Sequence, residues 1–378
     1  MEDIRMVDQK APYARLKSEL DAAFSAAMAS MGETDGQLVK SFGMKLGRYL
    51  NIEHVFPCAS SADALKIALL AQDLPAEAEV IVPAFGPAAG AEAVKLLGLK
   101  PVFADVLPET YMIDPSAVAK AVTPATAAIM PVHLFGQCAP MQELIAVAKQ
   151  HHLWVVEDTV QSLGAVYVGP EGREVKAGTM GHIGVFSFFP PKAISDPGDA
   201  GAVMTNDARL SDKIRDILQI NQSAAAEIRS AAVDSRMDVL QAAMLEVKIK
   251  YLDEYHAARQ EVARFYDNAF AETELVQAPH RVPYSSHIYQ QYAITVAPEL
   301  RDGLQEHLRA HHIPSVIYYP LPLHLQDTFA YLHYKAGDLP VAERLSKCIL
   351  SLPMHSELKE DQLTYICQHV LEFVKRHR

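Results

Sequence analysis

Two apolar runs in the middle of the chain carry side chains that can do chemistry. The first, Val155-Val156-Glu157, leads to Asp158, and the second, Ser187-Phe188-Phe189-Pro190-Pro191, starts with a hydroxyl and leads to Lys192. A carboxylate can keep a pyridine nitrogen protonated, a hydroxyl can bind a phosphate, and a lysine can form a Schiff base and then carry a proton. Pyridoxal phosphate requires all three functions of a protein, so we interpret the two runs as a candidate site for this cofactor.

Each of these residues has an ordinary explanation when it is taken alone. An Asp after a valine run is more often a turn or helix-capping residue, and a Lys after two prolines is more often a solvated loop residue. A buried carboxylate is nevertheless costly without a cationic partner, and a partly apolar site disfavours the charged form of a lysine. The cofactor interpretation therefore depends on the residues around the pair.

The sixteen histidines give no comparable pattern. His133 follows a predicted strand and is more often a structural hydrogen-bonding residue than a base. The pairs His151-His152 and His311-His312 fall at predicted helix ends, where we expect them to be solvated. Because the histidines lack a clustered spacing, we predict no metal site.

The elements that must position the candidate residues alternate between strand and helix. Helices are predicted at 62–71, 88–97 and 140–151, where Met141, Leu144, Ile145 and Ala148 recur at helical spacing. The predicted strands cover 55–58, 79–82, 101–104, 127–132, 153–157, 183–188 and 201–205. This alternation predicts an α/β fold with a mostly parallel seven-stranded sheet between helices. Ligands of such sheets bind at the carboxyl ends of the strands, where Asp158 and Ser187 fall.

A second, smaller unit follows a long helical segment. No Gly or Pro occurs from Asp238 to Glu272, which predicts one long or bent helix leaving the large domain. A strand-like stretch at 288–296, a helix near 301–311, the segment 315–319 and a final helix at 360–375 predict a small C-terminal α+β domain. We therefore divide the chain into a large domain, residues 1–245 with an N-terminal helical segment, and a small domain, residues 246–378. The Ala- and Ser-rich stretch 221–235 is predicted to be a mobile loop.

Composition restricts the class of protein. The chain has 378 residues, 50% of them hydrophobic, and a formal net charge of -12, which disfavours nucleic acid and anionic membranes as partners. Its beginning lacks the pattern of a signal peptide, and no run approaches the length of a membrane span. The cysteines form no CxxC pair and are too far apart to indicate a disulfide framework. They are Cys58, Cys138, Cys348 and Cys367. We expect a cytoplasmic protein.

Around the two opening runs, the chain resembles the DegT-type sugar-nucleotide aminotransferases, a branch of the fold-type-I pyridoxal phosphate enzymes, over nearly its whole length. The matching motifs occur in the same order as in that family. They are 60–65 (SSADAL), 131–137 (PVHLFGQ), 198–202 (GDAGA), 235–238 (SRMD) with 241–243 (QAA), 318–324 (YYPLPLH) and 350–353 (LSLP). The resemblance implies the aspartate-aminotransferase type of fold and a homodimer in which the second subunit completes each active site.

The resemblance also implies roles for individual residues. Lys192 corresponds to the Schiff-base lysine and Asp158 to the partner of the ring nitrogen. Gln161 corresponds to a residue that contacts the ring or its 3′-oxygen, and Ser187 to a phosphate ligand. Ser61 and its neighbour would offer backbone N–H groups to the phosphate at a helix start.

Three cofactor-binding positions depart from the family pattern. Ala62 stands where the family has a threonine, so one hydroxyl near the phosphate is lost. Pro87 stands where the family stacks an aromatic ring on the cofactor. Asp234 replaces an asparagine of the partner subunit, and a carboxylate there would repel a phosphate unless it is protonated or turned away.

The resemblance implies an enzyme that moves an amino group from L-glutamate to a UDP- or dTDP-linked keto-hexose in deoxyamino-sugar or surface-polysaccharide synthesis, with pyridoxamine phosphate as the intermediate form of the cofactor. The loop Tyr318-Tyr319-Pro320-Leu321-Pro322-Leu323-His324 is closer to members that aminate C3 than to those that aminate C4. In this loop Tyr318, Tyr319 and His324 are the candidate substrate-binding residues, although both tyrosines could equally pack the small domain and His324 could equally be structural. Two alternatives remain open: a sugar dehydratase, which the retained Lys192 disfavours, and a non-catalytic regulatory or sensor protein on the same fold.

Overall fold

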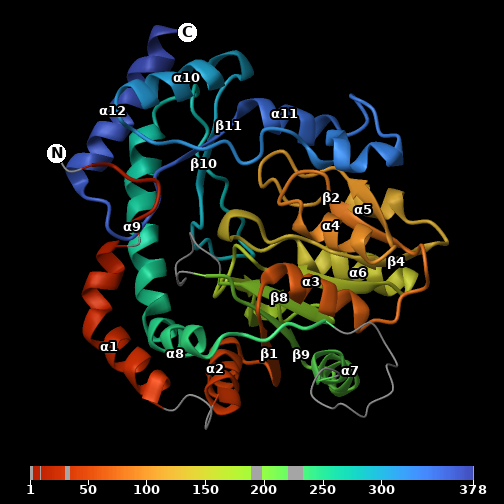
Figure 1. Ribbon diagram of the computed structural model, residues 1–378. Helices are drawn as coiled ribbons and strands as arrows, with labels where there is room; N and C mark the ends of the chain where they lie inside the picture. The colour runs from red at the N-terminus through yellow and green to blue at the C-terminus, as the bar shows by residue number, and fades with distance from the viewer. Residues whose placement is uncertain (1–2, 9, 30–34, 189–197, 220–232, 378) are drawn as a thin grey trace.

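The computed structural model describes residues 3–8, 10–29, 35–188, 198–219 and 233–377 (Figure 1). Its centre is a seven-stranded sheet with the strand order β1-β9-β8-β5-β4-β2-β3. The strands are β1 (His54–Cys58), β2 (Glu79–Pro83), β3 (Lys100–Ala104), β4 (Thr126–Ile129), β5 (Trp154–Asp158), β8 (Ile183–Ser187) and β9 (Gly201–Thr205). Because β9 pairs antiparallel with both β8 and β1 while the other neighbours are parallel, β9 alone runs against the rest. The predicted mostly parallel sheet is confirmed.

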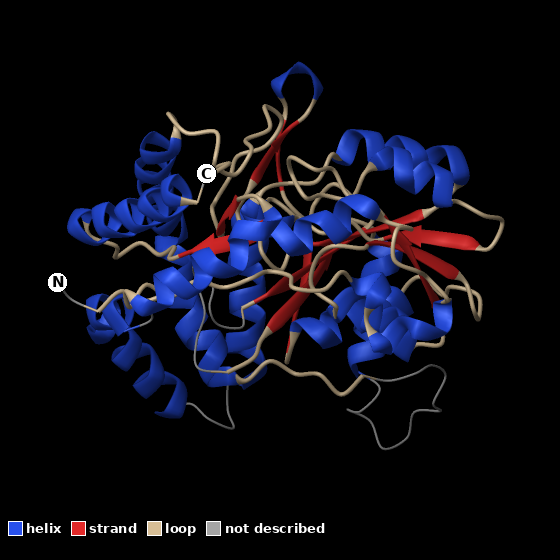
Figure 2. Cartoon of the chain, turned by 90° about the horizontal axis from the view of Figure 1, so that it is seen from above, coloured by secondary structure: helices blue, strands red, loops and turns tan. Residues whose placement is uncertain are grey.

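The central strands form because both of their faces are buried. Every residue of β2, β8 and β9 is buried, which explains their continuous apolar runs. Successive side chains point to opposite faces: Val185 and Val203 belong to one hydrophobic core, whereas Phe186 and Met204 belong to the other. Figure 2 shows helices on both sides of the sheet.

Helices cover the two faces and extend to the N-terminal part of the chain. The core with Val185 includes residues of α3 (Ser61–Leu70), α4 (Ala89–Leu96), α5 (Pro115–Ala121), α6 (Met141–His151) and α7 (Ala208–Gln219). The core with Phe186 includes residues of α2 (Asp35–Leu50) and α8 (Val239–Lys248), and α1 (Lys10–Ala29) packs on α8. The sequence did not single out the hairpin of β6 (Val166–Val168) and β7 (Glu174–Lys176).

The segment predicted as one long or bent helix is bent. Asp238 caps α8 by accepting hydrogen bonds from the backbone N–H of Leu240, at 2.8 Å, and of Gln241. A 3-10 turn at Ile249–Tyr251 separates α8 from α9 (Leu252–Phe270). The proposed domain boundary at residue 245 falls inside α8, and α9 runs along the small domain (Figure 1).

The elements of the small domain that follow α9 are β10 (Tyr292–Thr295), α10 (Pro298–Ala310), α11 (Pro340–Cys348), β11 (Ile349–Leu352) and α12 (Glu360–Arg376). In this domain, α9 packs with a two-stranded sheet, α10 and α12 in one hydrophobic core, whereas α11 packs on the core of the large sheet. Strands β10 and β11 are antiparallel, and residues 315–319 contribute only an isolated bridge between Val316 and Ser351. The predicted loop 221–235 lies largely outside the described residues, as does Lys192.

Candidate active site

The carboxyl ends of β5 and β8 bring two of the predicted residues to one edge of the sheet. The strands are parallel neighbours, with Asp158 beside Val185 in the register. Asp158 has no exposed surface, and its Oδ1 accepts a hydrogen bond from Val160 N at 3.1 Å. Ser187, which is 2% exposed, ends β8. A protonated pyridine ring would be a favourable partner for a carboxylate at this depth.

An anion site adjoins Ser187 at the start of α3. Ser60 caps this helix by accepting a hydrogen bond from Asp63 N at 3.0 Å, and Ala62 in the first turn is exposed. Gly201 pairs with Ser187 and lies so close to α3 that a Cβ there would be 2.5 Å from Ser60 O and 2.9 Å from Ser61 N. The first N–H groups of a helix favour an anion. The absence of a side chain at Gly201 thus keeps this helix start beside the end of β8, an arrangement that fits a phosphate.

Gln161 joins three parts of the chain next to the candidate carboxylate. Its Oε1 accepts a hydrogen bond from Phe135 N at 2.9 Å, and its Nε2 donates to the hydroxyl of Tyr319 at 2.9 Å. The ring of Tyr319 also meets Phe85, which follows β2, edge to face at 5.8 Å. Burial raises the pKa of Tyr319, so its hydroxyl is neutral and can accept from Gln161. The loop at 318–324 therefore reaches the sheet edge through Tyr319.

The departures Pro87 and Asp234 lie in different surroundings. Pro87 is half-buried between β2 and α4. Asp234 is exposed, and its carboxylate lies 3.6 Å from Arg236 Nε. The next residue, Ser235, is buried and bonds Ala59 N at 3.0 Å and the carboxylate of Asp63 at 2.9 Å. The segment therefore reaches the start of α3 through Ser235, while Asp234 faces outward.

Of the other candidate residues of the 318–324 loop, Tyr318 is half-buried beside Tyr319, with their ring centroids 5.7 Å apart. His324 is 1% exposed, and its Nε2 lies 3.2 Å from the carboxylate of Glu343 on α11. This burial and this contact are compatible with a structural role for His324, and its role in substrate binding stays a prediction.

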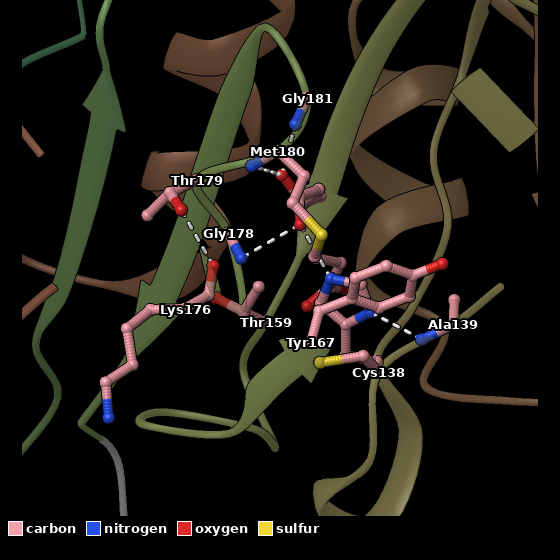
Figure 3. Close-up of polar contacts among 12 residues, drawn as sticks. Cys138, Ala139, Thr159, Tyr167, Lys176, Gly178, Thr179, Met180 and Gly181 are labelled. Carbon is pink, nitrogen blue, oxygen red and sulfur yellow. Dashed lines mark hydrogen bonds and ion pairs between the residues drawn. The ribbon is translucent and has the colours of Figure 1, made fainter. Parts of the chain in front are cut away.

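A buried network under the site contains a residue for which no sequence pattern predicts a role. Glu157 has no exposed surface and accepts hydrogen bonds from the backbone N–H groups of Gly178, Met180 and Gly181, the first two at 2.9 and 2.6 Å (Figure 3). Its Oε2 also lies 2.8 Å from Nε2 of His133. Four donors therefore surround this one buried carboxylate and occupy both of its oxygens.

The same network fixes the orientation of His133. Its Nδ1 accepts from Ala139 N at 2.9 Å, so the proton sits on Nε2 and is donated to Glu157. The backbone N–H of His133 donates to the carbonyl of Asp158 at 2.9 Å. This saturated bonding agrees with the structural role expected for His133, and it ties Glu157 to the backbone that carries Asp158.

The remaining histidines include one wrong expectation. His151 and His152 are exposed, as predicted. His311, however, is partly buried and lies beside His307 and His369. Because His369 is distant from the other two in the sequence, the spacing of the histidines does not indicate this cluster. The four cysteines are free and buried. In the part of the chain that is described, no helix is long and apolar enough to span a membrane.

Comparison with protein families matches residues 14–371 to the DegT/DnrJ/EryC1/StrS aminotransferase family. A relative named pleiotropic regulatory protein, from Geobacillus stearothermophilus, is 39% identical, over 99% of this chain and 99% of its own. The UDP-2-acetamido-2-deoxy-3-oxo-D-glucuronate aminotransferase of Pseudomonas aeruginosa is 35% identical, over 96% of this chain and 98% of its own.

Among solved structures, DesV of Streptomyces venezuelae in complex with a ketimine intermediate superposes with a TM-score of 0.92. It is 32% identical to this chain, and the match covers 100% of both chains. The shared architecture therefore includes both the large sheet and the small domain.

Proposed function

Because the chain belongs to the DegT/DnrJ/EryC1/StrS aminotransferase family, we propose that it transfers an amino group from L-glutamate to the keto carbon of a UDP- or dTDP-linked hexose. The observation that carries the proposal is the fully buried Asp158 at the end of β5, one strand from Ser187, which itself lies beside the start of α3. A buried acid suits the protonated nitrogen of a pyridine ring, and an anion site at the same sheet edge suits the phosphate that the ring carries.

Pyridoxal phosphate is the cofactor, with pyridoxamine phosphate as its second form. Ser61 N–H, Ala62 N–H and the hydroxyl of Ser187 would hold the phosphate, because these groups adjoin the start of α3. The carboxylate of Asp158 would hold a proton on the ring nitrogen. Lys192, which lies outside the described residues, is the proposed amine. Pro87 would cover the ring less effectively than an aromatic side chain does.

In the proposed mechanism, Lys192 transfers protons and Asp158 keeps the ring nitrogen protonated. The chemistry supplied by bound pyridoxal phosphate is that of an electron sink for the carbon that bears the amino group. Lys192 Nζ takes the α-proton of glutamate and later returns a proton to the sugar carbon that receives nitrogen. Asp158 keeps its negative charge throughout, because the proton at the ring nitrogen must not leave. Gln161, held by Phe135 N and Tyr319, keeps its amide in a fixed orientation beside this acid.

We further propose a 3-keto sugar as the acceptor. The name of the Pseudomonas aeruginosa relative specifies a 3-oxo sugar, and the resemblance of the Tyr318-Tyr319 loop to C3-aminating members favours the same class. Tyr319 is bonded to Gln161, so Tyr318 is the member of the pair with more freedom to meet a substrate. A homodimer in the cytoplasm, with Asp234 and Arg236 directed toward the partner's cofactor, completes the proposal.

A second candidate is a regulatory protein on the same fold. The Geobacillus stearothermophilus relative carries the name of a regulator, and Ala62, Pro87 and Asp234 weaken the expected cofactor contacts. A sugar dehydratase is disfavoured because Lys192 is retained.

The visible absorbance of bound pyridoxal phosphate separates the enzyme from the regulator. The purified protein is mixed with the cofactor, and the spectrum is compared with those of Lys192→Ala and of Lys149→Ala, a control at an exposed lysine of α6. The enzyme proposal predicts an absorbance band that only Lys192→Ala loses. A protein that the cofactor leaves colourless would favour the regulator.

Turnover then tests the acceptor. Glutamate is supplied with matched 3-keto and 4-keto sugars linked to UDP or dTDP, and the amino sugar is quantified. Turnover of the 3-keto sugars is expected, and turnover of 4-keto sugars alone would overturn the C3 assignment.

A further inference from the structure

Three histidines of the small domain lie together outside the residues of the candidate active site. His307 is in the last turn of α10, His311 follows the end of that helix, and His369 is in α12. One ring nitrogen of each lies within 4.8 Å of the others. All three side chains are partly buried, so the cluster is neither a fully solvated group nor part of the apolar core.

The packing of the two helices fixes the distance between His307 and His369. One turn before His307, Gly303 lies so close to α12 that a Cβ there would be 2.9 Å from the ring of Phe373. Phe373 is one turn after His369, so the two pairs face each other along antiparallel helices. Leu304 on the same helix is fully buried in the core between them. A close helix contact thus holds the two histidines in place.

The His307–His369 pair has the spacing of two ligands on one metal ion. Nε2 of His307 lies 3.2 Å from Nδ1 of His369. Two nitrogens bound at about 2.0–2.1 Å to a tetrahedral Zn²⁺ are separated by about 3.3 Å. One of these nitrogens donates a hydrogen bond to the other, so binding an ion requires that ring to carry its proton on its other nitrogen, with little movement of the rings.

His311 presents a third nitrogen in the required form. Its Nδ1 lies 2.8 Å from the backbone carbonyl of His307. A carbonyl can only accept, so Nδ1 carries the proton and Nε2 of the neutral ring keeps its lone pair. A hydrogen bond from the second ring nitrogen to a carbonyl is the usual partner of a ligating histidine. The ring of His311 lies 4.0 Å from the ring of His369, measured between centroids, and one nitrogen of each of the three rings lies within 4.8 Å of the others.

The electrostatic surroundings suit a cation that binds neutral imidazole. Burial lowers the pKa of His307 and of His369, and the neighbouring rings add to the shift. Glu372 is the negative group that opposes this shift for both histidines, whereas Arg376 adds to it. The carboxyl end of α10 contributes further negative potential.

We propose that His307, His311 and His369 bind one Zn²⁺ ion that joins α10 to α12, with water in the fourth position. Three imidazoles suit zinc and related divalent transition metals, whereas Mg²⁺ and Ca²⁺ require oxygen ligands. His311 and Tyr365 also line an open cleft of about 1120 Å³, which gives the ion a path from solvent. The alternative is a group of stacked neutral rings that binds no metal.

Isothermal titration of the metal-free, tag-free protein with Zn²⁺ tests the proposal. The wild-type chain should bind one Zn²⁺ at this site. His369→Gln and His311→Gln should each weaken binding by at least about tenfold, because loss of a ligand costs no less than loss of an outer-shell partner. The matched control is the double variant His151→Gln/His152→Gln, which removes two exposed histidines and should bind as the wild type does.

Circular dichroism of each variant checks that the chain is folded. His311→Gln serves as the second variant because His311 follows a helix end and is easier to replace than His369. Replacement of Zn²⁺ by Co²⁺ adds a readout of geometry, since a four-coordinate site gives visible absorbance that the ligand variants should lose. The proposal is wrong if the wild type binds no Zn²⁺, or if folded ligand variants bind it as tightly as the control does.

Discussion

Replacement of Glu157 by glutamine tests the network that supports the candidate site. The carboxylate accepts from four donors, two at each oxygen, and the side chain has no contact with water. An amide offers only one oxygen, so either orientation of the glutamine directs its NH₂ at two donors. His133 cannot relieve the conflict by moving its proton, because Nδ1 already accepts from Ala139 N.

The magnitude follows from the two donors that lose their partner. Each unpaired buried donor costs about 1–3 kcal/mol, which gives about 2–6 kcal/mol for Glu157→Gln. For a chain of 378 residues this corresponds to a fall of about 3–8 °C in the melting temperature. The control is Glu79→Gln, which should cost less, because the donors to Glu79 are side chains and not backbone N–H groups. Glu79 is bonded to the mobile amine of Lys100 and to the hydroxyl of Thr123, and both can adjust to an amide.

Differential scanning fluorimetry, with urea unfolding as a second method, measures both variants. A Glu157→Gln melting temperature equal to that of Glu79→Gln would refute the reasoning, since it would mean that the four donors find other partners. A loss confined to Glu157→Gln would support a carboxylate that holds the loop 178–181 and His133 against β5.

Three further predictions concern the site and its pH range. Tyr319→Phe removes the hydroxyl that accepts from Gln161, so kcat/KM should fall about 2- to 10-fold in a steady-state assay; an unchanged value would show that this bond does not orient the amide. Gly201→Ala places a methyl group against the start of α3 and should weaken binding of pyridoxal phosphate at least about tenfold in a fluorescence titration, whereas Gly36→Ala, with open space around it, should not. Burial lowers the pKa of His256 to about 3. Below about pH 6.5 the unfolded chain takes up a proton at this residue while the folded chain does not, so the free energy of unfolding should fall by about 2 kcal/mol between pH 7 and pH 5. His256→Gln should remove this loss in urea unfolding.

The sequence was sufficient for the sheet because its strands are buried on both faces. Continuous apolar runs such as Val80–Val82 and Val155–Val156 have few alternatives to a central parallel strand. The position of Asp158 at a carboxyl end followed from the same pattern. The sequence allowed a bend in the long helix but did not locate it at Ile249–Tyr251, because no Gly or Pro occurs there.

Contacts between distant segments could not be foreseen. The bond from Gln161 to Tyr319 joins residues 158 positions apart, and only the docking of the small domain brings them together. The four donors to Glu157 depend on where the loop 178–181 turns, which no periodicity encodes. His307 and His369 are 62 positions apart, so their spacing in the sequence gives no sign of a cluster that the packing of α10 on α12 creates.

The most direct test of the proposed reaction is transfer of nitrogen from isotopically labelled glutamate to a UDP- or dTDP-linked 3-keto sugar, followed by mass spectrometry of the sugar. The wild-type protein with pyridoxal phosphate should place one labelled nitrogen in each product molecule. Lys192→Ala and Asp158→Asn should abolish the transfer. Asp105→Asn should preserve it, because Asp105 caps α11 at the end of the edge strand β3. Transfer that survives in Lys192→Ala, or a wild type that binds the cofactor and labels none of these sugars, would contradict the account.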